Sequence, residues 1–90
     1  MNKSPKLYVQ VSTLFDLNGK MIPQYLVLED GHKYTIDKVM CVKPAPALKA
    51  GGYGDRYTVR IRGQERYLFF ERNTATDAAA PGKWFVECRN

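Results

Sequence analysis

The sequence predicts an all-β fold, and two features support that class. Apolar residues recur at every second position over most of the chain, whereas no long window keeps a helical spacing without a Gly or Pro interrupting it. Turn-forming pairs such as Asn18-Gly19 separate the alternating segments at short intervals. A chain of 90 residues buries only about 60–65% of its unfolded surface, which is enough for one core. We therefore expect a single domain over residues 1–90, with a flexible N-terminus at residues 1–5.

The first hairpin is predicted from the alternation over residues 7–15 and from the turn that follows. Asn18-Gly19 suits the positive φ angles of a two-residue turn. A turn of that length places Phe15 opposite Ile22 and gives both strands one shared apolar face.

The next turn, Glu29-Asp30-Gly31, favours a three-residue loop with its glycine in the left-handed conformation. That loop sets Leu26 opposite Tyr34, so the third strand joins the same apolar face. After residues 37–38 the alternation shifts by one position. The shift indicates a β-bulge that bends this strand before two prolines end it.

Two long connections, residues 43–54 and residues 73–83, flank the central part of the chain. Both are rich in Gly, Pro or Ala. Each contains a short stretch, Ala47–Ala50 and Thr74–Ala80, that could form one helical turn within a loop.

A further hairpin lies between these connections, and we place its turn at Gly63-Gln64 with glycine first. This turn sets Arg60 opposite Tyr67 on the outer face. It also sets two other arginines opposite carboxylates, in the pairs Arg56–Glu71 and Arg62–Glu65. The side chains predicted to face the core are Tyr57, Val59, Ile61, Leu68 and Phe70.

A last strand over residues 83–88 adds Trp84, and with it either Val86 or Phe85, to that core. Six strands in two antiparallel meanders, each bent by a glycine or a bulge, favour a small open barrel of the SH3-like or Sm-like kind. A small β-sandwich is the alternative architecture.

Composition and charge restrict the function. The net charge of +5 favours anionic partners, with nucleic acid first among them. Cys41 and Cys88 lack metal-site spacing and His32 is the single histidine, so we expect reduced thiols, no metal and no cofactor. No nucleophile motif accompanies the scattered carboxylates, so we expect no enzyme activity. Because no stretch is apolar enough for a signal peptide or a membrane span, we expect a cytoplasmic protein.

The outer face of the hairpin at residues 54–71 is the candidate binding surface. It combines cations with aromatic rings, as single-strand nucleic-acid platforms do. The residues are Arg56, Thr58, Arg60, Tyr67 and Phe69. We predict that this face binds single-stranded or structured nucleic acid. The alternative is that a long connection covers the two rings, which would make them part of the core.

The segment KAGGYGDR, residues 49–56, offers a second anion contact. Successive glycines let backbone N–H groups converge on an oxyanion, and Lys49 and Arg56 add positive charge. No GK[ST] sequence follows, so a nucleic-acid backbone is a better candidate ligand than a nucleotide cofactor. The same glycines also suit a simple turn at the start of a strand.

The stretch LEDGHKYTIDKVMCVKPAPALKAGGYGDRYTVRIRGQERYLFFE, with KWFVE near the end, resembles a small bacterial family of β proteins of unknown function. Its members carry a DGxxYxID segment, a Gly-rich centre, RYTVRI and a terminal WFVE, so the resemblance spans about residues 7–88. Similar short β proteins are encoded near translesion DNA polymerases of the Y family. The resemblance implies a partner in DNA repair and transfers no active-site residue.

Two functions of different classes follow from these observations. In the first, the domain is a nucleic-acid-binding module. In the second, it is a protein–protein adaptor that uses an exposed strand edge or homodimerisation, without nucleic acid.

Overall fold

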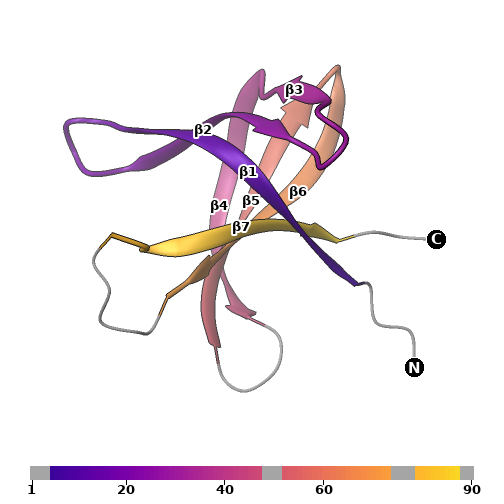
Figure 1. Ribbon diagram of the computed structural model, residues 1–90. Helices are drawn as coiled ribbons and strands as arrows, with labels where there is room; N and C mark the ends of the chain where they lie inside the picture. The colour runs from indigo at the N-terminus through magenta and orange to yellow at the C-terminus, as the bar shows by residue number, and fades with distance from the viewer. Residues whose placement is uncertain (1–4, 48–51, 74–78, 88–90) are drawn as a thin grey trace.

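The computed structural model describes residues 5–47, 52–73 and 79–87, and all of their regular structure is β (Figure 1). The all-β prediction is therefore confirmed. No described segment is a helix with the length and apolar character that crossing a membrane requires. The strands are β1 (Lys6–Phe15), β2 (Met21–Val27), β3 (Lys33–Thr35), β4 (Lys38–Ala47), β5 (Gly52–Ile61), β6 (Gln64–Arg72) and β7 (Gly82–Glu87).

A single antiparallel sheet in the order β3-β2-β1-β7-β6-β5-β4 contains all seven of these strands. It curls into a half-barrel, in which β1 and β7 cross in front of β4, β5 and β6 in the view of Figure 1. The two edge strands, β3 and β4, are consecutive in the chain. The short link between them therefore bridges the seam of the half-barrel.

Seven strands replace the predicted six because the chain turns a corner at Ile36 and Asp37. The amide of Ile36 donates to the carbonyl of Gln24 beside β3 at 2.9 Å, whereas the amide of Asp37 donates to the carbonyl of Arg60 in β5 at 2.8 Å. Successive residues thus bind to opposite edges of the sheet, which divides the expected bent strand into β3 and β4. The predicted bulge lies just beyond, where the register of β4 shifts.

β1 pairs with two strands along its length. Lys6–Val9 pairs with β7, and Gln10–Phe15 pairs with β2. This division lets the sheet bend at the middle of β1. It also carries the β1–β2 hairpin beyond the other strands, to the left in Figure 1.

The first hairpin closes with a longer loop than the two-residue turn predicted. The amide of Asp16 donates to the carbonyl of Lys20, and the amide of Gly19 donates to the carbonyl of Asp16, each at 2.9 Å. Gly19, at φ 79°, takes the left-handed position of this loop. Phe15 therefore pairs with Met21, one residue earlier than predicted. The turn after β2 has the predicted form, with Gly31 at φ 89°.

Part of each predicted connection is strand. β4 and β5 remain paired well inside the expected 43–54 loop, and β7 begins at Gly82. At Gly54 a Cβ would lie 2.5 Å from the carbonyl oxygen of Phe70, so the absence of a side chain lets β5 run close to β6. Most of the two stretches considered for helical turns, and residues 1–4, lie outside the described residues.

One hydrophobic core fills the half-barrel. Trp84 packs edge to face against Tyr57 and Phe70, with ring centroids 5.0 and 4.9 Å apart. Val59 and Leu68 are 0% and 1% exposed. The predicted inward sides of β5 and β6 are therefore confirmed. The buried core residues are Leu26, Ile36, Tyr57, Val59, Leu68, Phe70 and Trp84.

Candidate nucleic-acid interface

The turn between β5 and β6 sets which residues face one another on the candidate surface. It consists of Arg62 and Gly63, with φ of 52° and 77°, a two-residue turn whose twist matches that of the strands. The predicted turn at Gly63-Gln64 is wrong, because glycine occupies the second central position and not the first. Asp37 supports the arginine in its left-handed conformation, since Oδ2 of Asp37 accepts from the amide of Arg62 at 3.1 Å.

This turn slides the pairing of β5 and β6 by two residues from the predicted register. Each side chain keeps its side of the sheet, because a slide of two residues preserves the alternation. Arg60 is opposite a carboxylate and not opposite the predicted Tyr67 ring, whereas Arg56 loses its predicted acidic partner. The cross-strand pairs on the outer face are Arg56–Phe69, Thr58–Tyr67 and Arg60–Glu65.

Arg56 takes the place beside the Tyr67 ring that was predicted for Arg60. Its guanidinium carbon lies 4.6 Å from the ring centroid. Its Nε is buried without a hydrogen-bond partner, and Arg56 belongs to none of the ion pairs among the described residues. The charge is therefore oriented by an aromatic ring and has no counterion among the described residues.

Four aromatic side chains form a continuous row across β1, β7 and β6, which we call the outer aromatic row: Tyr8, Phe85, Phe69 and Tyr67. Tyr8 meets Phe85 edge on at 5.9 Å, and Phe85 stacks on Phe69 at 5.0 Å with 7° between the planes. Phe69 in turn meets Tyr67 edge on at 6.4 Å. The order follows from the register, because Tyr8 and Phe69 both lie directly opposite Phe85.

The two ends of the outer aromatic row are the parts most open to solvent. Tyr67 is 48% exposed and Tyr8 is 44% exposed, whereas Phe85 is 2% exposed. The alternative in which a connection covers both rings of β6 does not hold for Tyr67, since about half of its surface is open. Phe69 is half-buried. The row thus has a packed centre and an accessible tyrosine at each end.

Cations lie over other rings of the row. Nζ of Lys6 is 4.7 Å from the centroid of Phe85, and Nζ of Lys83 is 5.3 Å from the centroid of Tyr8. Contacts of this kind at exposed sites contribute about 0.5–1 kcal/mol each. Together with Arg56, these lysines place positive charge at both ends of the row.

Glu71 is an acidic residue within this basic face. Its Oε1 accepts a hydrogen bond from the hydroxyl of Tyr8 at 2.7 Å and lies 3.5 Å from Nζ of Lys6. The hydrogen bond raises the pKa of Tyr8 above its ordinary value of 10.0, because an ionised phenol would lose it and repel the carboxylate. Glu71 therefore fixes Tyr8 and offsets one of the two lysines, so one positive charge remains at each end of the row.

The remaining predicted residues lie in different places. Lys49 is outside the described residues, as is Cys88, whereas Cys41 in β4 is a free thiol. Within the described part of the chain, no group of three or more His, Cys, Asp or Glu could hold a metal ion.

The sequence-based prediction missed the half of the face that comes from the two ends of the chain. Tyr8 alternates with core residues of β1, and that pattern places it outside, but it does not show which strand lies next to β1. For the last strand, the sequence left open whether Val86 or Phe85 joins Trp84 on the core face, and the structure places Phe85 in the outer aromatic row. The missing information was the pairing of β1 with β7, which brings Tyr8 to Phe85.

No family model matches the chain, and comparisons with curated proteins and with solved structures likewise found no match.

Proposed function

We propose that this protein is a small, non-enzymatic module that binds single-stranded or structured nucleic acid on its outer face, without a cofactor. The Arg56–Tyr67 pair carries this proposal. It sets a guanidinium that has no ion-pair partner in the described part of the chain against a ring that is half open. Single-strand binders combine these two elements, a cation for the phosphates and a ring for the bases.

The residues of the face have separate tasks in this function. Arg56 binds a phosphate, and Tyr67 stacks on a base, which contributes about 1–3 kcal/mol per base. Tyr8 and Lys83 repeat this combination at the other end of the outer aromatic row, 5.3 Å apart. The closely packed Phe85 between them keeps the two stacking positions at a fixed separation.

Other predicted residues have supporting tasks. Thr58, directly opposite Tyr67, offers a hydroxyl to the same ligand. Lys49 and Arg60 add long-range positive charge, although Arg60 has Glu65 opposite it.

The wider setting is part of the same proposal. An SH3-like or Sm-like barrel fits a strongly curled antiparallel sheet that presents one outer face. The resemblance to proteins encoded near Y-family polymerases favours a task in DNA repair, in the cytoplasm of a bacterium.

Fluorescence anisotropy with labelled single-stranded DNA, single-stranded RNA and duplex DNA tests the function. We expect micromolar binding that weakens steeply as salt rises, because phosphate contacts release counterions. The double variant Arg56→Ala with Tyr67→Ala should weaken binding at least about tenfold. Absence of salt-sensitive binding to all three nucleic acids would remove the proposal.

Arg66→Ala is the matched control for this double variant. Arg66 is an exposed arginine of the same hairpin, it donates to Gln64 at 2.6 Å, and it lies opposite the inward-facing Val59. Its loss removes the same charge from the other face. We therefore expect Arg66→Ala to change binding much less than the double variant does, and we expect near-native melting for both.

A protein adaptor is the second candidate function, and the free edge of β4 favours it. β4 is at the edge of the sheet, and β5 is its single paired neighbour among the strands that the structure describes. Met40 and Val42 on this strand are 38% and 48% exposed. An extended peptide could add to the edge before Pro44, which lacks the amide that a longer pairing needs. Val42→Lys should abolish capture of such a partner and leave nucleic-acid binding intact.

A further inference from the structure

The tip of the β1–β2 hairpin exposes three large apolar side chains. Leu14, Phe15 and Leu17 are 51%, 62% and 105% exposed. We call these three residues the apolar knob. The hairpin that carries it extends away from the other strands (Figure 1). Leu14 and Phe15 are successive residues of β1, so the tip exposes apolar surface on both of its faces. Large apolar side chains gathered at one exposed tip are typical of contact surfaces.

Asp16 fixes the backbone of the loop that carries the apolar knob. Oδ1 of Asp16 accepts from the amide of Asn18 at 2.8 Å and from the amide of Lys20 at 2.9 Å. Its own amide and carbonyl also form the backbone hydrogen bonds that close the loop. A preorganised tip of this kind loses little conformational entropy when it binds.

The opposite end of the molecule contains a cleft of about 980 Å³. Among the described residues, β6 pairs with β7 only over Phe69–Arg72, and the cleft lies beside Gln64–Leu68, the part of β6 for which no second strand is described. Its apolar wall includes Leu26, Leu28, Val59, Ile61 and Val86. Its mouth carries both signs of charge: Arg62, Arg66, Glu65 and Glu87.

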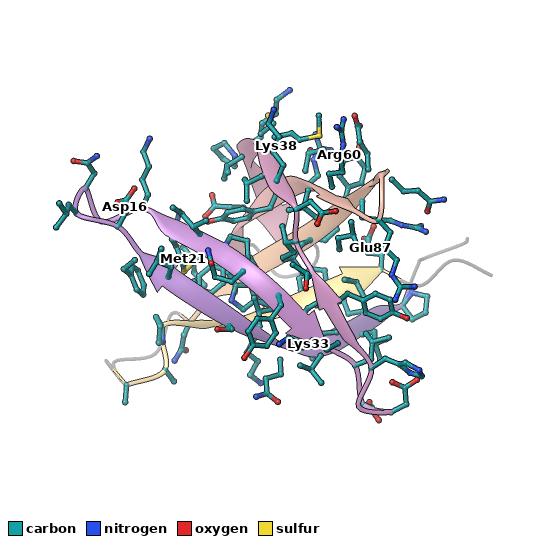
Figure 2. All side chains as sticks on the ribbon, turned by 90° about the horizontal axis from the view of Figure 1, so that it is seen from above. Asp16, Met21, Lys33, Lys38, Arg60 and Glu87 are labelled. Carbon is teal, nitrogen blue, oxygen red and sulfur yellow. The ribbon has the colours of Figure 1, made fainter. Side chains whose placement is uncertain are left out.

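The knob and the cleft lie at opposite ends of the molecule. Figure 2 shows Asp16 at one side and Glu87 at the other, across the body of the sheet. A single copy therefore cannot place its own knob in its own cleft.

We propose that the apolar knob of one molecule seats in the cleft of a second copy, head to tail. Leu17 and Phe15 would fill the apolar part of the cleft. The two charges beside them would find opposite charges among the lining residues of the cleft, Arg62 and Arg66 for Asp16, and Glu65 and Glu87 for Lys20. A membrane surface or a DNA groove fits the knob less well, because the tips that insert there are flanked by several cations and this one carries one charge of each sign.

Such a contact is heterologous, because it joins two different surfaces. It produces open chains or closed rings and not a two-fold dimer. It is independent of the proposed nucleic-acid function, although Tyr67 and Phe69 border the cleft as well as belonging to the outer aromatic row. The association is therefore measured on the protein without nucleic acid.

Sedimentation velocity and light scattering over a range of protein concentrations test the contact, using two variants. Leu17→Asp disables the knob at a fully exposed position. Arg62→Asn with Arg66→Glu disables the mouth of the cleft, and Asn tolerates the positive φ of residue 62. We expect the mass of the native protein to at least double as concentration rises, whereas each variant alone stays monomeric.

An equimolar mixture of the two variants is the decisive sample. The Leu17→Asp variant retains a cleft and the other retains a knob, so we expect the mixture to form a dimer with one copy of each. Native protein that stays monomeric, a Leu17→Asp variant that associates like the native protein, or a monomeric mixture would each overturn the proposal. Thermal melting of both variants is measured alongside, because a variant with a lowered melting temperature could lose association through misfolding. A cleft variant that folds poorly is replaced by Arg66→Glu alone.

Discussion

The guanidinium of Arg56 lies 4.6 Å from the centre of the Tyr67 ring, although the residue directly opposite Arg56 is Phe69. The contact is thus diagonal, between side chains two positions apart along neighbouring strands. It leaves Tyr67 about half exposed while a cation covers part of its ring. Tyr67, the most exposed aromatic residue of this face, therefore also has a cation held against its ring.

Phe85 should be a structural residue although it lies on the outer face. It is 2% exposed and stacks on Phe69 at 5.0 Å. We expect Phe85→Ala to lower the free energy of unfolding by about 3–5 kcal/mol, as for other buried aromatics. Urea unfolding measures this change. Tyr8→Ala, at a ring that is 44% exposed, is the control and should cost much less; equal costs would contradict the packed centre of the row.

Gly54 should not tolerate a side chain. A Cβ at this position would lie 2.5 Å from the carbonyl oxygen of Phe70, a backbone atom that can move only if β5 and β6 separate. We expect Gly54→Ala to destabilise the protein by about 1–3 kcal/mol through overpacking. Thermal melting checks this prediction, with Arg60→Ala in the same strand as a control of small effect. An unchanged melting temperature would show that the two strands are further apart.

The stability of the protein should fall at alkaline pH through Tyr8. Its pKa is raised above 10.0 chiefly by the hydrogen bond to Glu71. A group whose pKa is higher in the folded than in the unfolded state contributes stability below the unfolded pKa and loses it as the pH rises through the folded pKa. Native protein should therefore be more stable than Tyr8→Phe at neutral pH, and the difference in unfolding free energy should shrink above about pH 10.

Urea unfolding of both proteins over that pH range measures the difference. Tyr57 also has a raised pKa, caused mainly by burial. It is present in both proteins, so its contribution cancels in the comparison. A difference that does not change with pH would show that the Tyr8 hydroxyl does not stabilise the fold through Glu71.

Arg62→Asn should stabilise the hairpin of β5 and β6. Arg62 adopts φ 52° in a turn that favours Asn-Gly at its two central positions. Arginine gains a contact over the Tyr34 ring at 5.1 Å, but this exposed contact is worth only about 0.5–1 kcal/mol. The relief of left-handed strain is worth about 1–2 kcal/mol. We expect a net gain, seen as a higher melting temperature, and a loss of stability would mean that the ring contact dominates.

The sequence was enough to predict toward which face of the sheet most side chains point. It was not enough to predict which residue lies opposite on the neighbouring strand. The alternation of Tyr57, Val59 and Ile61 placed these residues inside correctly because sidedness is a local property of a strand. The turn was not determined in the same way, since Gly63 can take either central position of a two-residue loop. The observed turn is stabilised by the hydrogen bond from the amide of Arg62 to Asp37, and Asp37 lies far from the turn in the sequence.

The same distinction applies to the candidate surface. Tyr67 and Phe69 were placed on the outer face from the sequence, because they alternate with Leu68 and Phe70. Phe85 and Tyr8 complete the outer aromatic row from a strand pairing that no local pattern reports. Long-range neighbours of this kind depend on the curvature of the whole sheet, which the corner at residues 36–37 and the division of β1 produce together.

The pairing of β1 with β7 has a consequence for how the chain folds during synthesis. The two strands are the most distant of the seven in sequence, yet they are neighbours in the sheet. As the ribosome releases the chain, β1 and β2 can form their hairpin early, but the other half of β1 lacks its neighbour until β7 emerges. Contacts of such long range slow folding. The rings of Tyr8 and Phe85 therefore cannot meet until β7 has been synthesised, so the surface that they help to form is completed after the other six strands have emerged.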